Sequence, residues 1–165
     1  MKTIQQYLTE NGEKIPGTSG TGKYVKCLIS YDNKILVLRR STGTKGEGNW
    51  DLPGGEIEEN ETPKQAIRRE IEEETNLRVT KLKQLTNITI GHGKGIIRVN
   101  TTIFQAEPSG RRDVALLPTD NNTNFQNVPR PEHSEYRWIQ FQDELERMPM
   151  IKDLLNVILK RLKKR

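Results

Sequence analysis

The sequence contains little cysteine and no long apolar segment. Cys27 is the only cysteine among the 165 residues, so an internal disulfide cannot form. It lies in the apolar run YVKCLIS, where a buried structural thiol is expected rather than a nucleophile. No apolar run approaches the roughly 20 residues of a membrane-spanning helix, and the N-terminal residues MKTIQQYLTENGEK lack the apolar core of a signal peptide. A reducing, cytoplasmic location with no membrane partner is therefore expected.

Charged residues are abundant and unevenly distributed. Lys and Arg number 27 against 22 Asp and Glu, which gives a net charge of +5. Acidic residues concentrate in residues 54–76, GGEIEENETPKQAIRREIEEETN, and basic residues in the C-terminal LKRLKKR. A basic protein with one acidic segment suits an anionic substrate that needs a metal between like charges. Net charge alone also fits plain solubility, so the spacing within the acidic segment has to decide.

The hydrophobic pattern predicts one domain in which strands and helices alternate. A flexible lead-in is expected over residues 1–22, followed by the domain at residues 23–165. Five segments are rich in apolar residues that favour β-strands. The predicted strands cover residues 23–30, 34–40, 78–90, 95–107 and 134–141. The predicted helices cover residues 63–75, 143–148 and 150–164. The polar stretch from Pro108 to Pro131 is expected to be a long loop. This order indicates a mixed α/β or α+β fold.

A helix is expected to begin inside the acidic segment. Thr62 can cap it, Pro63 suits the first helical position, and Gln65 can complete a capping box with Thr62. The residues that follow, KQAIRREIEEET, carry apolar side chains at helical spacing. The helix should therefore present one face to the core.

Three carboxylates share one side of this helix. At about 100° per residue, Glu70, Glu73 and Glu74 fall within one arc beside the apolar stripe. Like charges at this spacing repel each other, and the helix dipole disfavours them near the C-terminus. This cost suggests a compensating cation, and oxygen-only ligands favour Mg²⁺ or Mn²⁺ over zinc. The alternative is a solvated helix face on which glutamates pair with arginines.

The acidic segment resembles the Nudix box, G-x5-E-x7-R-E-U-x-E-E-x-G-U, in which U is an aliphatic residue. The residues that match in register are Gly55, Glu61, Arg69, Glu70, Ile71, Glu73, Glu74 and Leu77. Asn76 stands where the family has glycine. That position ends the helix, and asparagine is the next best residue for the left-handed backbone expected there. The flanking sequences WDLPGG and EHSEYRWI extend the resemblance over most of residues 23–141.

The resemblance to Nudix hydrolases implies a fold and a reaction. The implied fold is a mixed β-sheet sandwiched between α-helices. The implied reaction is metal-dependent hydrolysis of a pyrophosphate bond in a nucleoside diphosphate linked to another moiety. Water attacks phosphorus, and Mg²⁺ or Mn²⁺ neutralises the phosphate oxygens and activates the water.

The resemblance also implies roles for residues of the box. The implied metal ligands are the Gly54 carbonyl, Glu70, Glu73 and Glu74. Arg69 is expected to pair with Glu61 and to orient the carboxylates, and Gly55 has a structural role in the motif. A bare surface ion pair is the alternative for Arg69.

Outside the box, Glu135 and Arg40 are candidate site residues. The general base that takes a proton from water is either Glu70 or Glu135, and Glu135 could instead be an additional ligand or an exposed strand residue. Strand alternation sends Arg39 and Arg40 to opposite faces, so only one of them can contact substrate phosphates. Arg40 is the one expected to do so.

The substrate remains open at the level of sequence. The region TIGHGKGII lacks the proline that would suggest ADP-ribose and the tyrosine that would suggest dinucleoside polyphosphates. Nucleoside triphosphates, modified or sugar nucleotides and RNA 5′ ends remain. A hypothesis of another class is a Nudix-fold nucleic-acid-binding module, for which the basic tail with Arg111, Arg112 and Arg130 is the support. The chain lacks an aromatic-rich platform for such a role, and a binding module has no need of three costly carboxylates.

Overall fold

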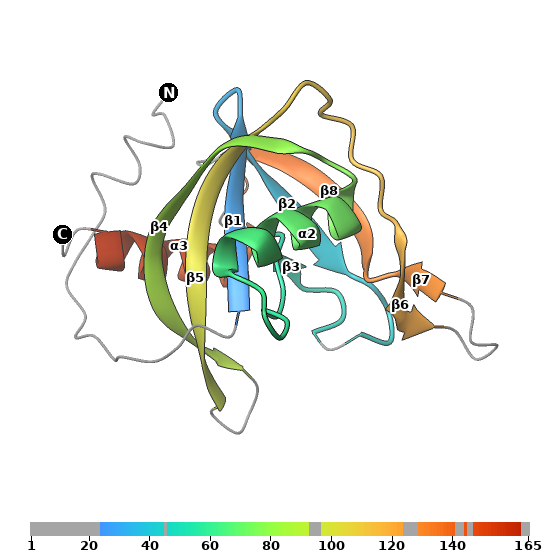
Figure 1. The fold of residues 1–165 in the computed structure, drawn as a ribbon, viewed down its shortest axis with the longest axis horizontal. Helices are drawn as coiled ribbons and strands as arrows, with labels where there is room; N and C mark the ends of the chain where they lie inside the picture. The colour runs from blue at the N-terminus through green and yellow to red at the C-terminus, as the bar shows by residue number, and fades with distance from the viewer. Residues whose placement is uncertain are drawn as a thin grey trace.

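The computed structural model describes residues 24–44, 46–92, 97–123, 129–140, 144 and 147–162. These residues form a six-stranded mixed sheet with a helix on each face, and a separate two-stranded sheet beside it (Figure 1). This confirms the predicted mixed sheet between helices. The predicted lead-in, residues 1–22, lies outside the described residues.

The main sheet combines parallel and antiparallel pairing. Its strands are β1 (Tyr24–Tyr31), β2 (Lys34–Arg40), β3 (Trp50–Asp51), β4 (Val79–His92), β5 (Ile97–Pro108) and β8 (His133–Gln140). Five strands lie in the order β3-β2-β1-β5-β4, and β8 pairs with β2. β1 and β5 are parallel, and the other pairs are antiparallel.

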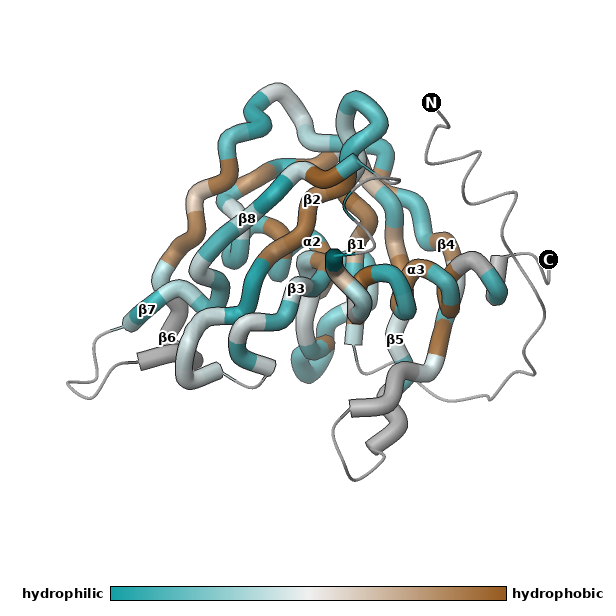
Figure 2. The backbone as a smooth tube through the Cα atoms, turned by 180° about the vertical axis from the view of Figure 1, so that it is seen from behind, coloured by the Kyte–Doolittle hydropathy of each residue, from teal (hydrophilic) through white to brown (hydrophobic). Residues whose placement is uncertain are grey.

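The two helices lie on opposite faces of the sheet, α2 (Pro63–Thr75) on one and α3 (Pro149–Leu162) on the other (Figures 1 and 2). Alternating strand side chains supply an apolar layer to each face. α2 buries Ile67 and Ile71 against one layer, and α3 buries Ile151, Leu155 and Ile158 against the other. No helix in the described ranges is long and apolar enough to span a bilayer.

Cys27 is fully buried in the core beneath α2, as its sequence context predicts. Burial raises the pKa of its thiol far above the ordinary value. The thiolate is therefore suppressed, and a nucleophilic role is disfavoured.

Two expectations about irregular regions were wrong. The stretch from Pro108 to Pro131 is not one long loop, because it contains the antiparallel strands β6 (Pro118–Thr123) and β7 (Pro129–Pro131). Their composition is polar and proline-rich, which hides them from a search for apolar strands. In the predicted helix at residues 143–148, the described residues Glu144, Arg147 and Met148 are not α-helical.

Candidate active site

Helix α2 begins and ends as its sequence predicts. The Thr62 hydroxyl accepts a hydrogen bond from the Gln65 amide (3.2 Å), and the Gln65 side chain accepts one from the Thr62 amide (2.9 Å). This is the predicted capping box. At the other end, Asn76 adopts the left-handed conformation (φ 55°) and its amide donates to the carbonyl of Glu72 at 2.8 Å. Asparagine thus takes the conformation expected at the position where the box has glycine.

The Gly54–Gly55 turn brings the chain against both β1 and α2. Cys27 and Val25 donate backbone hydrogen bonds to the carbonyls of Pro53 and Gly55, both at 2.9 Å. Gly54 has φ +143°, and a Cβ there would collide with the backbone carbonyl of Val25. A Cβ on Gly55 would instead meet the carboxylate of Glu70, with Oε2 at 2.7 Å. A Cβ at Gly54 would therefore meet fixed backbone, whereas a Cβ at Gly55 would displace the Glu70 carboxylate.

Arg69 holds several carboxylates of the box in place. Nε and Nη2 donate to the two oxygens of Glu61 at 2.9 and 3.0 Å. Nη1 donates to Glu70 at 2.9 Å and to Glu73 at 3.1 Å. Nη2 also donates to the backbone carbonyl of Glu56 at 3.0 Å. All five guanidinium N–H groups thus have an acceptor, and the predicted pairing with Glu61 is present.

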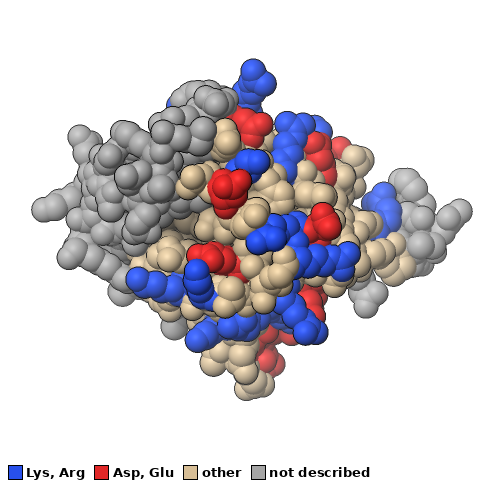
Figure 3. All heavy atoms as spheres, turned by 90° about the horizontal axis from the view of Figure 1, so that it is seen from above, with Lys and Arg blue, Asp and Glu red and all other residues tan. Residues whose placement is uncertain are grey.

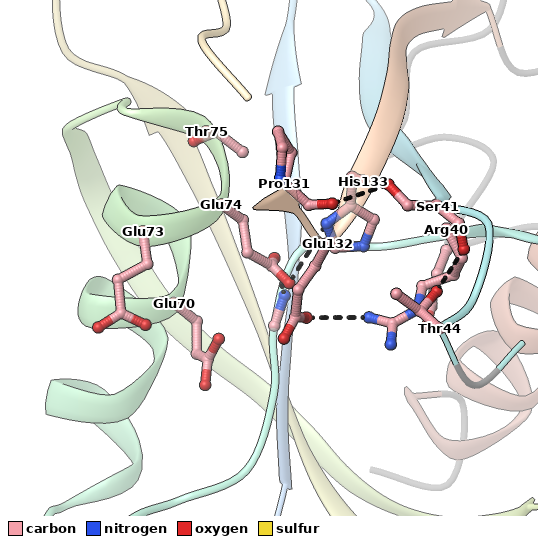
Figure 4. Close-up of polar contacts among 12 residues, drawn as sticks. Arg40, Ser41, Thr44, Glu70, Glu73, Glu74, Thr75, Pro131, Glu132 and His133 are labelled. Carbon is pink, nitrogen blue, oxygen red and sulfur yellow. Dashed lines mark hydrogen bonds and ion pairs between the residues drawn. The ribbon is translucent and has the colours of Figure 1, made fainter. Parts of the chain in front are cut away.

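Glu74 is the most deeply buried carboxylate of the site, with 4% of its side chain exposed. Its Oε2 accepts a hydrogen bond from the Gly54 amide at 2.9 Å, and its Oε1 lies 3.6 Å from Nδ1 of His133 (Figure 4). Burial raises the pKa of Glu74 well above the ordinary value, and the nearby charge of Glu70 raises it further. A buried carboxylate beside a second carboxylate favours either a proton or a cation.

Glu132, the residue before β8, joins this cluster, and sequence reasoning missed it. Its side chain points toward Glu74 across the space between α2 and the loop after β2 (Figure 4). Its charge contributes to the raised pKa values of Glu70 and Glu74. Its Oε2 forms an ion pair with Nη1 of Arg40 at 3.2 Å. The sequence did contain a signal, because Glu132 is the first residue of EHSEYRWI, one of the flanking sequences that extend the family resemblance.

The structure does not bring Glu135 to the cluster. Its carboxylate lies 3.5 Å from Nη1 of Arg39 and 2.8 Å from Nε of Arg137. In the pairing of β2 with β8, Arg39 lies opposite Glu135 and Arg40 lies opposite His133, with a register shift between them. One extra residue in β8 thus places His133 and Glu135 on opposite faces of the sheet. His133 and Arg40 share the face of α2.

His133 is buried beneath the cluster with 3% of its surface exposed. Burial, together with the positive charges of Arg40 and Lys26, lowers the pKa of its imidazole to about 3, against an opposing effect of Asp51. Its contact with Glu74 is therefore not an ion pair near neutral pH. Lys26 is itself buried and forms an ion pair with Asp51, with 2.6 Å between Nζ and Oδ2.

The donor chemistry of the site fits a hard divalent cation. Glu70, Glu74 and Glu132 offer oxygen atoms only, and their mutual repulsion in a partly buried space favours a positive ion. In the orientations present, no three acidic, histidine or cysteine side chains among the described residues enclose an ion position. Arg69 and Arg40 bind carboxylates of the cluster in these orientations.

Comparisons with known proteins agree on the family. A profile of the NUDIX domain matches residues 21–158. A "MutT-like protein" of Streptomyces ambofaciens is 35% identical over 83 residues, which are 50% of this chain and 49% of that protein. An "RNA pyrophosphohydrolase" of Pelagibacter ubique is 25% identical over 142 residues, which are 82% of this chain and 84% of that protein.

A solved structure shows the same fold. The crystal structure of the MutT protein from Methanosarcina mazei Go1 has a TM-score of 0.58 and 22% identity, and the match covers 86% of this chain and 94% of that one. The chain spans about half the length of some curated relatives, 49% in the case of the Streptomyces protein. Because the NUDIX profile matches residues 21–158, most of the sequence, the chain belongs to the NUDIX domain family.

Proposed function

We propose that this protein hydrolyses a pyrophosphate bond in a nucleoside diphosphate linked to another moiety, with Mg²⁺ or Mn²⁺ as cofactor. The observation that carries the proposal is the convergence of Glu70 and Glu74 from α2 with Glu132, the residue before β8. The charge of Glu132 raises the pKa of both Glu70 and Glu74, and the charge of Glu70 raises that of Glu74. Such crowding has no structural advantage, whereas a cation and an anionic substrate give it a use.

The cation would be held by carboxylates of the box and one from outside it. Its proposed ligands are the Gly54 carbonyl, Glu70, Glu73, Glu74 and Glu132. Glu132 takes the outside position for which Glu135 was the sequence candidate. When bound, a divalent cation neutralises phosphate oxygens and lowers the pKa of coordinated water. Arg69 orients the carboxylates before any ligand arrives, because all of its donors are already engaged.

Glu70 is the proposed general base. Among the described residues only its Oε1 is hydrogen-bonded, to Arg69, which leaves Oε2 to accept a proton from water. Burial raises the pKa of Glu70, and the charges of Glu73 and Glu132 oppose its ionisation as well. A raised pKa brings a carboxylate closer to the operating pH, where general bases are most effective.

Arg40 is the proposed contact for a substrate phosphate. It lies on the α2 face of the sheet, where its guanidinium pairs with Glu132. Arg39 lies on the other face and pairs with Glu135. A guanidinium binds phosphate oxygens through two parallel hydrogen bonds, so Arg40 can stabilise charge that develops on the transferred group.

Hydrolysis at the 5′ end of RNA is a second candidate. It is supported by the similarity to the RNA pyrophosphohydrolase of Pelagibacter ubique, which extends over 82% of this chain. A binding-only module has less support. Basic and acidic side chains are interspersed over the described part of the face in Figure 3, whereas a nucleic-acid track needs a continuous basic surface.

The test is metal-dependent turnover on a panel of nucleotides. The panel contains nucleoside triphosphates, an oxidised nucleotide, ADP-ribose, sugar nucleotides, dinucleoside polyphosphates and RNA with a 5′ triphosphate. The wild type is compared with Glu74→Gln and with Glu72→Gln, an exposed residue of the same helix that serves as the matched control. The expected result is turnover that requires Mg²⁺ or Mn²⁺, disappears in Glu74→Gln and persists in Glu72→Gln. A folded wild type that turns over no member, or a fully active Glu74→Gln, would contradict the proposal.

A further inference from the structure

We infer that His133 is a positioning residue that fixes Glu74 through a contact from Nδ1 to Oε1. This holds Glu74 in the orientation in which it binds a divalent cation. The inference rests on the proposed function and assigns a role to a residue that lies outside the Nudix box.

The two oxygens of Glu74 have different neighbours. Oε2 is anchored by the Gly54 amide at 2.9 Å, and Oε1 faces Nδ1 of His133 at 3.6 Å. Both the Glu74 and the His133 side chains are 4% exposed, so water has little access to compete for this contact (Figure 4). The imidazole is therefore the group that can set the rotation of the carboxylate about its anchored oxygen.

The fold delivers His133 to this position by an irregularity in the sheet. The register shift between Arg39 and Arg40 turns His133 onto the α2 face, away from the face that carries Glu135. Two hydrogen bonds tie the preceding residues to the loop after β2. The Ser41 amide donates to the Glu132 carbonyl, and the Ser41 hydroxyl donates to the Pro131 carbonyl, both at 2.8 Å. A bulge next to a site commonly serves to re-aim a side chain.

The chemistry suits a supporting role rather than direct ligation. A neutral imidazole with its proton on Nδ1 donates one hydrogen bond, and a carboxylate ligand held by such a bond keeps one orientation toward the ion. The present separation of 3.6 Å is slightly longer than a hydrogen bond. Contacts of this kind commonly shorten when the ligands of a site are in place.

The test is Mn²⁺ affinity in the absence of substrate, measured by the electron paramagnetic resonance signal of free Mn²⁺. His133→Asn and His133→Leu have nearly the same shape, but only asparagine can place an N–H close to the position of Nδ1. We expect His133→Asn to bind Mn²⁺ within about threefold of the wild type, and His133→Leu to bind about 10- to 100-fold more weakly. Ser134→Ala, an exposed neighbour on β8, is the matched control and should bind like the wild type.

Each other outcome of the binding experiment would overturn the inference and would indicate a different reason for its failure. Equal weakening in His133→Asn and His133→Leu would show that the residue acts through packing alone. Full affinity in both variants would show that Glu74 needs no support from His133. A wild type that binds no Mn²⁺ would instead contradict the proposed function on which the inference rests.

A second measurement needs no variant at His133, so it can be made even if the His133 variants do not fold. The chain has two histidines, His92 and His133, so the imidazole ¹⁵N signals can be assigned with one substitution, His92→Gln. In the Mg²⁺-loaded protein we expect His133 to carry its proton on Nδ1. A proton on Nε2 would leave a lone pair facing the Glu74 carboxylate and would overturn the inference.

Discussion

Replacing Gly54 and Gly55 with alanine, one at a time, should separate folding from function within two adjacent residues. Gly54 has φ +143°, and an added Cβ would collide with the backbone carbonyl of Val25, which the sheet holds in place. A strained backbone of this kind costs about 1–3 kcal/mol, and a clash with fixed backbone adds to it. We expect Gly54→Ala to lose at least about 3 kcal/mol, a large part of the roughly 5–15 kcal/mol that stabilises a typical domain.

Gly55→Ala should instead keep most of the stability of the fold and lose Mn²⁺ affinity. Gly55 is not left-handed, and the atoms nearest to its added Cβ belong to the Glu70 carboxylate, with Cδ at 2.6 Å and Oε2 at 2.7 Å. The end of a side chain can move, so the fold should survive with a loss below about 1 kcal/mol. Glu70 must then leave its hydrogen bond to Arg69, and Mn²⁺ affinity should fall about 10- to 100-fold.

The assays are thermal unfolding followed by circular dichroism and Mn²⁺ binding in solution. At about 2–4 °C per kcal/mol for a chain of this size, Gly54→Ala should lower Tm by roughly 6–12 °C. Gly110→Ala is the matched control, because Gly110 has φ +77° with open space around the added Cβ. Gly110→Ala should lose only the stability that the strained backbone costs. The reasoning is refuted if Gly54→Ala melts like Gly110→Ala, or if Gly55→Ala keeps full Mn²⁺ affinity.

Three further predictions concern single side chains. Glu132→Gln should lower Mn²⁺ affinity and turnover at least about tenfold, whereas Glu135→Gln should change both by less than about threefold; equal effects in direct assays would contradict the placement of these residues. Cys27 should resist iodoacetamide in the native protein and react once urea unfolds it, because burial raises its pKa; mass spectrometry would detect early labelling. The pairing with Arg69 lowers the pKa of Glu61, so its stabilisation is complete above the ordinary value of 4.5 and is lost as pH falls through the lowered value. The free energy of unfolding, measured with urea from about pH 7 to pH 3, should therefore fall less steeply toward low pH in Glu61→Gln than in the wild type. The same pH dependence in both proteins would count against the pair.

Features set by local sequence could be predicted, and features set by pairing between distant segments could not. The capping box of Thr62 and Gln65, the left-handed Asn76 and the apolar face of α2 all follow from neighbouring residues, and all are present. The parallel pairing of β1 with β5 joins residues 77 positions apart in the chain, such as Tyr24 and Thr101, and no local pattern encodes it. The strands β6 and β7 were missed because their pairing is not driven by apolar side chains.

The same distinction divides the site. The resemblance to the Nudix box implied that Arg69 pairs with Glu61, and this pair is present. Strand alternation was sufficient to separate Arg39 from Arg40, which pair with Glu135 and Glu132 respectively. Outside the box the sequence pointed to Glu135 and gave no indication of Glu132. Register decides which side chain faces α2, and a one-residue bulge changes that face without leaving a mark in the composition.

The two walls of the site are therefore fixed by different physical means. On α2 the guanidinium of Arg69 donates its hydrogen bonds to residues of the box, so this wall is ordered by contacts within the box. The facing wall, with Glu132 and His133, depends on the pairing of β2 with β8 and on the loop that Ser41 ties to it. Glu74 is buried on the α2 wall and contacts both Gly54 and His133, so its orientation depends on both walls being in place. A change in sheet register can consequently disable the site while every residue of the box remains intact.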